Sequence, residues 1–187
     1  MIFLCGPHCT GKTELSNTLR QENYTIIELG KIVREIYTDL KVQSDFHDWS
    51  VAVEKECGPE YIDTLILEKL SKKLAGASSE YTNKVVIVGA RSLRIINRIK
   101  ESEIGQDNNL IIYIDSTYQN LRVRYSIREG TEISDKSFKC LLRNDETLGL
   151  NEIKKNADFI IQNNGNLSEF LNNCVSILNK KVYLKCK

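Results

Sequence analysis

Short, continuous apolar runs alternate along the chain with longer segments that have the period of an amphipathic helix. The runs are Ile2–Cys5, Tyr24–Leu29, Val85–Val88, Leu110–Ile114 and Phe159–Ile161. Runs of this kind are typical of strands that are buried on both faces, whereas a half-exposed strand alternates apolar and polar residues. The pattern therefore predicts the strands of a parallel sheet.

The clearest helical segment runs from Pro59 to Leu74. Its apolar residues fall on one stripe, namely Ile62, Leu65, Ile66, Leu70 and Leu74. Gly58 can end a preceding helix, Pro59 suits a first helical position, and Gly76 suits the C-terminal cap. Because strands and helices alternate, we predict an α/β fold with helices on both faces of the sheet and ligands beyond the carboxyl ends of the strands.

The first apolar run leads directly into a glycine-rich stretch with Walker A spacing, a glycine, four residues and then Gly-Lys-Thr. It comprises Gly6, Pro7, His8, Cys9, Thr10, Gly11, Lys12 and Thr13. A helical pattern follows from Lys12 to Arg20, which is the context that a phosphate-binding loop requires. The glycines let successive N–H groups point at phosphate oxygens, and the helix N-terminus adds its positive end. Lys12 would reach the β- and γ-phosphates and Thr13 would bind Mg²⁺, so we predict ATP and Mg²⁺ as cofactors.

Composition narrows the class of protein. The chain has 187 residues, a net charge of +1, two prolines and ten glycines, which indicates a single domain (1–187) without a linker. No stretch is apolar for long enough to span a membrane, so we expect a cytoplasmic protein without a membrane partner, either a monomer or a homodimer. The six cysteines lack metal-site spacing and are expected to be free thiols. Cys9 lies near a helix N-terminus, where a thiolate is favoured.

Three further stretches resemble P-loop kinases of the nucleoside-monophosphate kinase and dephospho-CoA kinase group. LGKIVRE (29–35) is similar to the segment after the second strand, and VVIVGARS (85–92) to a segment that ends in an acceptor-binding arginine. DFIIQNNGNLSEF (158–170) is similar to the last strand and its Asn/Gly turn beside the adenine. The resemblance implies a three-layer sandwich with a five-stranded parallel sheet. It also implies an ATP-dependent kinase whose acceptor is nucleotide-like.

Residue by residue, the resemblance places Arg34 and Arg91 on the acceptor, and Asn164 and Gly165 on ATP. Guanidinium groups pair well with phosphate, although either arginine could instead be a solvated surface residue. A segment that covers the acceptor is expected at about 31–80.

An arginine-rich lid is expected at about 117–147. Its arginines would close on ATP and stabilise charge on the transferring phosphoryl group. We assign Arg128 and Arg143 as catalytic and Arg124 as nucleotide-binding. The alternative is an ordinary charged helix face that includes Arg122.

The sequence departs from the family in two carboxylates. The aspartate that helps to hold Mg²⁺ in nucleoside-monophosphate kinases is replaced by Val88, and Asp115 could substitute for it or cap a helix. An aspartate that acts as base in dephospho-CoA kinases aligns with Gly30. Glu28 is the nearest substitute, or else a structural residue that binds the backbone or Arg34.

The stretch KVQSDFHDWS (41–50) has no clear period and reads as a loop over the acceptor. Phe46 and Trp49 could stack on a base there, or form a hydrophobic lid edge, and His47 or Asp45 could act as a base.

Two other functions stay open. Some phage P-loop kinases phosphorylate a hydroxymethylated base in DNA, and the basic stretch Lys180–Lys187 could contact phosphates, although it could also be a solvated tail. A non-catalytic nucleotide-binding module that lost its aspartate is the third possibility.

Overall fold

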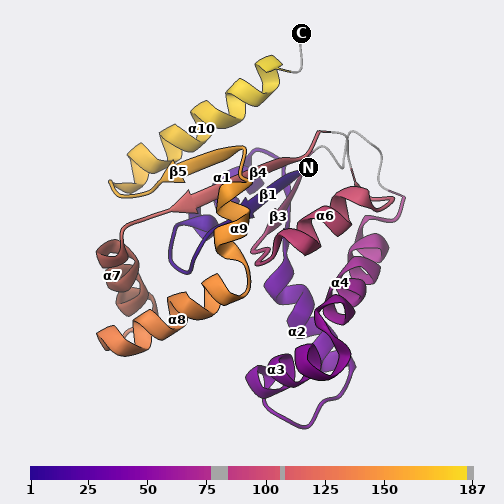
Figure 1. The fold of residues 1–187 in the computed structure, drawn as a ribbon. Coiled ribbons are helices and arrows are strands. Elements are labelled where there is room, and N and C mark those ends of the chain that lie inside the picture. The colour runs from indigo at the N-terminus through magenta and orange to yellow at the C-terminus, as the bar shows by residue number, and fades with distance from the viewer. Residues whose placement is uncertain (77–83, 106–107, 185–187) are drawn as a thin grey trace.

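The computed structural model describes residues 1–76, 84–105 and 108–184, with a five-stranded parallel sheet at the centre (Figure 1). The strands are β1 (Ile2–Cys5), β2 (Thr25–Glu28), β3 (Val85–Val88), β4 (Leu110–Asp115) and β5 (Phe159–Gln162). They lie in the order β2-β3-β1-β4-β5, and every neighbouring pair is parallel. All five predicted strands are confirmed, and each ends within one residue of its predicted bound.

Helices cover both faces of this sheet. They are α1 (Lys12–Gln21), α2 (Leu29–Asp39), α3 (Phe46–Cys57), α4 (Pro59–Leu74), α6 (Leu93–Glu101), α7 (Tyr118–Glu129), α8 (Asp135–Thr147), α9 (Leu150–Lys155) and α10 (Leu167–Leu184). The predicted helix over Pro59–Leu74 is confirmed at both ends, with Gly58 as its N-cap residue.

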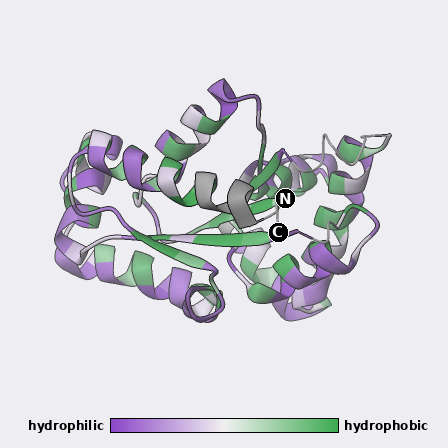
Figure 2. Cartoon of the chain, turned by 90° about the horizontal axis from the view of Figure 1, so that it is seen from above, coloured by the Kyte–Doolittle hydropathy of each residue, from purple (hydrophilic) through white to green (hydrophobic). Residues whose placement is uncertain are grey.

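Successive apolar side chains of β1, β2, β3 and β4 enter two separate cores, as the two-residue period of a strand requires. Phe3 and Ile87 lie in one core with apolar residues of α2, α4, α6 and α9. Leu4 and Val88 lie in the other, with residues of α1 and α10. Figure 2 shows the hydrophobic strands between helices whose outer faces are hydrophilic. The three-layer α/β sandwich is therefore confirmed.

The segment expected as a loop at 41–50 is partly helical, because α3 begins at Phe46. Trp49 is buried in the core, and its ring lies 5.3 Å from that of Tyr37 and 5.8 Å from that of Phe46. Its aromatic contacts are thus made within the protein, so the expectation that Trp49 stacks on a bound base is wrong. The His47 side chain lies outside the described residues.

The segment expected as a lid contains α7 and α8, which lie beyond the carboxyl end of β4 (Figure 1). Phe138 of α8 is fully buried and packs on the rings of Tyr118 and Tyr125 of α7. The two helices therefore share a small aromatic core of their own. Among the described residues, none of the helices has the length and apolar composition to cross a bilayer.

Candidate phosphate-binding site

The loop between β1 and α1 has the backbone that its glycines predict. Gly6 has φ of 135°, and a Cβ atom at this position would overlap the carbonyl oxygen of Ile114. Gly11, with φ of 102°, is the N-cap residue of α1, which begins at Lys12. Only glycine tolerates the first of these positions without moving β4. Because the loop follows β1, the central strand, it lies at the carboxyl end of that strand, where ligands of open parallel sheets bind.

Lys12 turns its ammonium group back into this loop. Its Nζ donates to the carbonyl oxygens of Gly6 at 2.7 Å and of Pro7 at 2.5 Å. The pKa of Lys12 is lowered to about 8, chiefly by burial and next by the nearby positive charge of Arg91, while the charge of Asp145 opposes both. A polyanion bound at this loop would restore the ordinary pKa, because it favours the charged form.

His8, the third residue of the phosphate loop, makes a three-way contact that the sequence did not predict. His8 Nδ1 lies 2.7 Å from Oδ2 of Asp145, and the backbone N–H of His8 donates to the same oxygen at 3.3 Å. Arg91 donates from Nη1 to Oδ1 of Asp145, and its Nη2 lies 3.0 Å from Nε2 of His8. Asp145 comes from α8, and only 2% of its side chain is exposed.

These contacts fix the tautomer of His8. A guanidinium group only donates hydrogen bonds, so the Nε2 atom that faces Arg91 must accept. The ring proton then lies on Nδ1 and is donated to Asp145. Burial alone would raise the pKa of Asp145, but the hydrogen bond from His8 and the charge of Arg91 together hold it below its usual range. Asp145 is therefore a charged carboxylate at the entrance of the phosphate loop.

Asn163 links the phosphate loop to α7 and was also missed from the sequence. Its Nδ2 donates to the carbonyl oxygen of Thr10 at 2.8 Å, and its Oδ1 accepts from Nη2 of Arg124 at 3.3 Å. Asn164, the predicted neighbour, binds elsewhere: its Oδ1 accepts from Ser116 Oγ at 3.1 Å and from the Thr117 N–H at 2.9 Å. The sequence offers two adjacent asparagines in this turn, and either of them could have bonded to the phosphate loop. The sequence alone therefore points to the pair without deciding between Asn163 and Asn164.

The lid arginines differ in their surroundings. Arg128 pairs with Glu129 at 2.7 Å and lies over the ring of Tyr125, while its charge also acts on the thiol of Cys9. Arg143 is exposed on α8. Gly165 lies against the Glu169 carboxylate, which would overlap a Cβ atom there. The catalytic and nucleotide-binding roles of these residues stay predictions.

Cys9 departs from its expected chemistry. It has a φ of 61°, which is strained for a residue with a side chain. Burial raises the pKa of its thiol in spite of the nearby charges of Arg128 and Lys12. A thiolate is therefore disfavoured at Cys9, which agrees with a plain loop residue and not with a redox-sensitive thiol.

Glu28, the predicted base, is the last residue of β2, and Arg34, the second predicted acceptor arginine, lies on the helix α2 that follows. Arg34 donates to the carbonyl oxygen of Gly30 at 3.1 Å and lies 5.3 Å from the ring centre of Phe46. Glu28 pairs with Lys31 at 2.6 Å. The structural alternative for Glu28 thus has a partner, although it is Lys31 and not Arg34.

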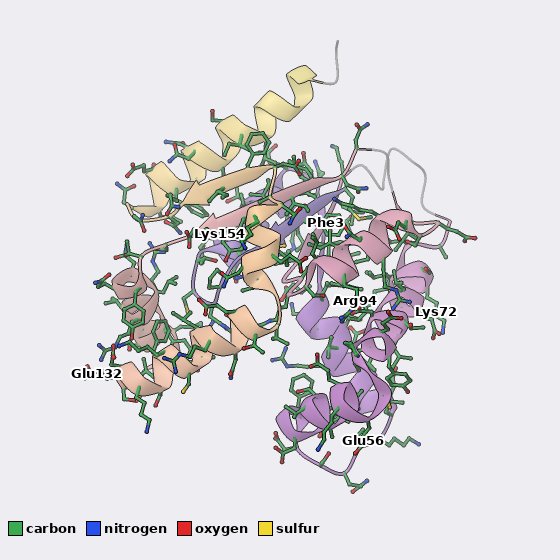
Figure 3. All side chains as sticks on the ribbon, in the orientation of Figure 1. Phe3, Glu56, Lys72, Arg94, Glu132 and Lys154 are labelled. Carbon is green, nitrogen blue, oxygen red and sulfur yellow. The ribbon has the colours of Figure 1, made fainter. Side chains whose placement is uncertain are left out.

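The proposed metal substitute, Asp115, has partners of its own. Its Oδ2 accepts from Nζ of Lys154 at 2.8 Å, and its Oδ1 accepts from the Ser116 N–H at 3.0 Å. Lys154 lies on α9, where Figure 3 labels it. It does not cap α7, because Thr117 does so by accepting from the N–H of Asn120. The alternative in which Asp115 is a helix cap is therefore wrong.

Among the residues that the structure describes, no group of three or more His, Cys, Asp or Glu side chains could hold a metal ion. Mg²⁺ in nucleotide-dependent enzymes is commonly bound by one or two side chains and substrate phosphates, not by a cage of carboxylates. Thr13 lies exposed in the first turn of α1, directly after Lys12. This single hydroxyl fits a site that a nucleotide would complete.

Comparison with known proteins agrees with this geometry at the level of the fold. No family model matches the chain. Over 186 residues it is 25% identical to a UPF0200 protein of Saccharolobus islandicus, an alignment that covers 96% of this chain and 93% of the relative.

Similar solved structures include a gluconokinase from Sinorhizobium meliloti (TM-score 0.59, 13% identity, 100% of this chain and 97% of the other). They also include a shikimate kinase from Bacteroides thetaiotaomicron (0.59, 16%, 95% and 97%) and a dephospho-CoA kinase from Campylobacter jejuni (0.55, 17%, 96% and 95%). At these identities the likeness concerns the fold alone. The chain has the fold of P-loop kinases, as the resemblance predicted, without a match to one particular kinase.

Proposed function

We propose that this protein transfers the γ-phosphoryl group of ATP to a small, nucleotide-like acceptor. The observation that carries the proposal is the position of Lys12. Its ammonium group lies inside a Walker A loop at the carboxyl end of the central strand, with a pKa lowered to about 8 by burial and by Arg91. A buried cation with so few compensating anions is suited to a polyphosphate.

The roles of the surrounding residues follow from their places in the fold. The loop N–H groups and Lys12 would bind the β- and γ-phosphates. Arg124 and Arg128 of α7, with Arg143 of α8, would neutralise charge on the phosphoryl group as the lid closes. When Mg²⁺ is bound, Thr13 would hold it together with the phosphates, and the ion would neutralise charge between them.

Acceptor binding is assigned to Arg91 and Arg34, which follow the carboxyl ends of β3 and β2. These two strands are neighbours in the sheet, so both arginines lie on the same side of the phosphate loop. The similar structures are named as kinases of gluconate, shikimate and dephospho-CoA, which supports a small acceptor. The side chains of residues 179–187, which include the basic stretch considered for DNA, lie outside the described residues.

The test is transfer of labelled phosphate from ATP in the presence of Mg²⁺. The panel of acceptors contains nucleoside monophosphates, dephospho-CoA, shikimate, gluconate and DNA with hydroxymethylated bases. We expect transfer to a small acceptor, and its loss in Lys12→Ala. Lys139→Ala serves as a matched control, because Lys139 is an exposed lysine of α8 that pairs with Asp135.

Three results would contradict the proposal. A folded Lys12→Ala protein with the turnover of the wild type would exclude phosphoryl transfer at this loop. Tight ATP binding without transfer to any acceptor would favour the non-catalytic module instead, and labelling of DNA alone would favour the phage-type kinase.

A further inference from the structure

Asp145 accepts hydrogen bonds from the kind of donors that bind a phosphate group. The backbone N–H of His8, the Nδ1–H of the same residue and the guanidinium group of Arg91 all converge on its two carboxylate oxygens. Backbone N–H groups of a Walker A loop and arginine side chains are typical phosphate donors. A carboxylate of the protein itself therefore fills an anion-binding position at the mouth of the loop.

The charges around this position require an anion. Arg91 and Lys12 are close enough for the arginine to lower the pKa of the lysine, whereas the charge of Asp145 raises it. Two cations that meet in a partly buried site repel each other unless a negative group lies between them. If Asp145 left, another anion would have to take its place.

The attachment of α8 allows such an exchange. Phe138 and Asp145 are the two buried residues of this helix, and Phe138 packs on α7. Asp145 is thus the buried link between α8 and the phosphate loop. A charged carboxylate that moves from this position into water loses no solvation, so its hydrogen bonds and its attraction to Arg91 and Lys12 are what oppose its release.

A glycine, Gly149, lies between α8 and α9. Gly149 has φ of 111°, and a Cβ atom there would lie 3.3 Å from the backbone oxygen of Arg91. Gly149, one helical turn beyond Asp145, therefore lies against the backbone of Arg91. The same glycine is the N-cap residue of α9, so it separates α8 from a helix that is packed in the core through Leu150 and Ile153.

We propose that Asp145 occupies a phosphate-binding position formed by His8 and Arg91, and that a phosphate group of the substrates replaces it and releases the lid helix α8. The inference rests on the proposed function, because it assumes that phosphates bind at this loop. In the first step of binding, the Asp145 carboxylate and a phosphate group of the substrate compete for this position. Withdrawal of Asp145 makes the His8 N–H available for a phosphate of ATP and makes Arg91 available for the acceptor.

The test compares Asp145→Asn with the wild type in binding of inorganic pyrophosphate and of ATP by calorimetry. Asparagine keeps the shape but lacks the charge that competes with phosphate. If the carboxylate occupies the position in more than about 90% of molecules, its removal tightens binding roughly tenfold or more, because apparent affinity scales with the competent fraction. Unchanged or weaker binding by a folded Asp145→Asn protein would overturn the proposal.

Asp63→Asn is the matched control. Asp63 is also buried and also pairs with an arginine, since Nε of Arg94 donates to it at 2.5 Å, but it joins α4 to α6 away from the loop. We expect Asp63→Asn to leave pyrophosphate affinity unchanged. Equal tightening in both variants would overturn the proposal, since it would trace the effect to general loosening of the fold.

A second measurement uses the wild-type protein and does not depend on the folding of a variant. With carboxyl carbons labelled, saturating pyrophosphate should move the ¹³C signal of Asp145 to the position of a solvated carboxylate, while the signal of Asp63 stays in place. An unmoved Asp145 signal at saturation would refute the exchange. Pyrophosphate exchange without transfer to any acceptor would refute the kinase proposal alone, and failure to bind pyrophosphate and ATP would refute both.

Discussion

The side-chain amide of Asn163 donates to the backbone carbonyl oxygen of Thr10 at 2.8 Å, across 153 positions of sequence. Only 6% of Asn163 is exposed. Its amide oxygen accepts from Arg124, so one buried side chain joins the phosphate loop, the last strand and the lid. A buried polar group in this position contributes through the hydrogen bonds that it completes.

The first prediction concerns Asn163→Asp. The change removes the donor to Thr10 and places a carboxylate against a carbonyl oxygen, so both groups lose a favourable partner. We expect the free energy of unfolding to fall by about 1–3 kcal/mol, the usual penalty for an unsatisfied buried group. Denaturant unfolding measures it. The matched control is Asn17→Asp on the exposed face of α1, for which a change of comparable size would contradict the role given to Asn163.

The second prediction follows from the lowered pKa of Lys12. Below pH 8 the lysine is charged with and without ATP, so the affinity for ATP should not depend on this group. Above pH 8 the nucleotide-free protein loses the proton, whereas bound phosphates retain it. ATP binding should then take up a proton and weaken by up to about tenfold per pH unit. Calorimetry at pH 7 and 9.5, in buffers of different ionisation enthalpy, measures both effects.

The lowered pKa of Lys12 also affects how the free energy of unfolding depends on pH. The folded protein holds this proton less tightly than a free lysine, whose pKa is 10.5. Between pH 8 and 10.5 the unfolded state therefore binds more protons, and the contribution of Lys12 to the free energy of unfolding rises with pH in this window. Lys12→Arg is the control, because its guanidinium group stays charged throughout. If ATP binding took up as many protons in Lys12→Arg as in the wild type, the uptake would belong to another group.

The strands, the phosphate loop and the helix over Pro59–Leu74 were predictable because their signals are local. A buried parallel strand is a continuous apolar run, and Gly6 is needed where the backbone of β4 comes close. The partnership of His8 with Asp145 has no such signal. It joins residues 137 positions apart, and only the path of the lid brings α8 over the loop. Asp145 also lies in an arginine-rich segment, for which the sequence predicts cationic and not anionic site residues.

The third prediction separates the two acceptor arginines from the nucleotide site. Arg91→Ala and Arg34→Ala should raise the Michaelis constant for the acceptor far more than that for ATP. A charged hydrogen bond to phosphate is worth about 1.5–3 kcal/mol, or roughly 10- to 150-fold. Steady-state kinetics with each substrate varied in turn is the measurement. Arg98→Ala on the exposed face of α6 is the control, since Arg98 binds Thr64 and the carbonyl oxygen of Glu60.

Arg91→Ala has a further consequence, since it leaves the buried charge of Asp145 with His8 as its partner. We expect this variant to be less stable than Arg34→Ala, whose arginine is exposed. Thermal unfolding of both variants is the check. A loss of ATP affinity with an unchanged Michaelis constant for the acceptor would contradict the assignment of both arginines.

The last prediction decides the class of acceptor through Glu28. If the acceptor is a hydroxyl group, Glu28→Gln should slow the chemical step by about 10²–10⁴-fold, because the amide cannot take up a proton. If the acceptor is an ionised phosphate, the change should have little effect.

Glu35→Gln is a close control, since Glu35 lies on the following helix and pairs with Lys73 at a similar exposure. Both variants lose one ion pair to a lysine, so their difference isolates the proton-accepting role. Single-turnover rates with the identified acceptor give the answer. A decrease below about tenfold in Glu28→Gln would exclude Glu28 as the base. The ion pair with Lys31 would then be its function, and an acceptor that needs no deprotonation would be favoured.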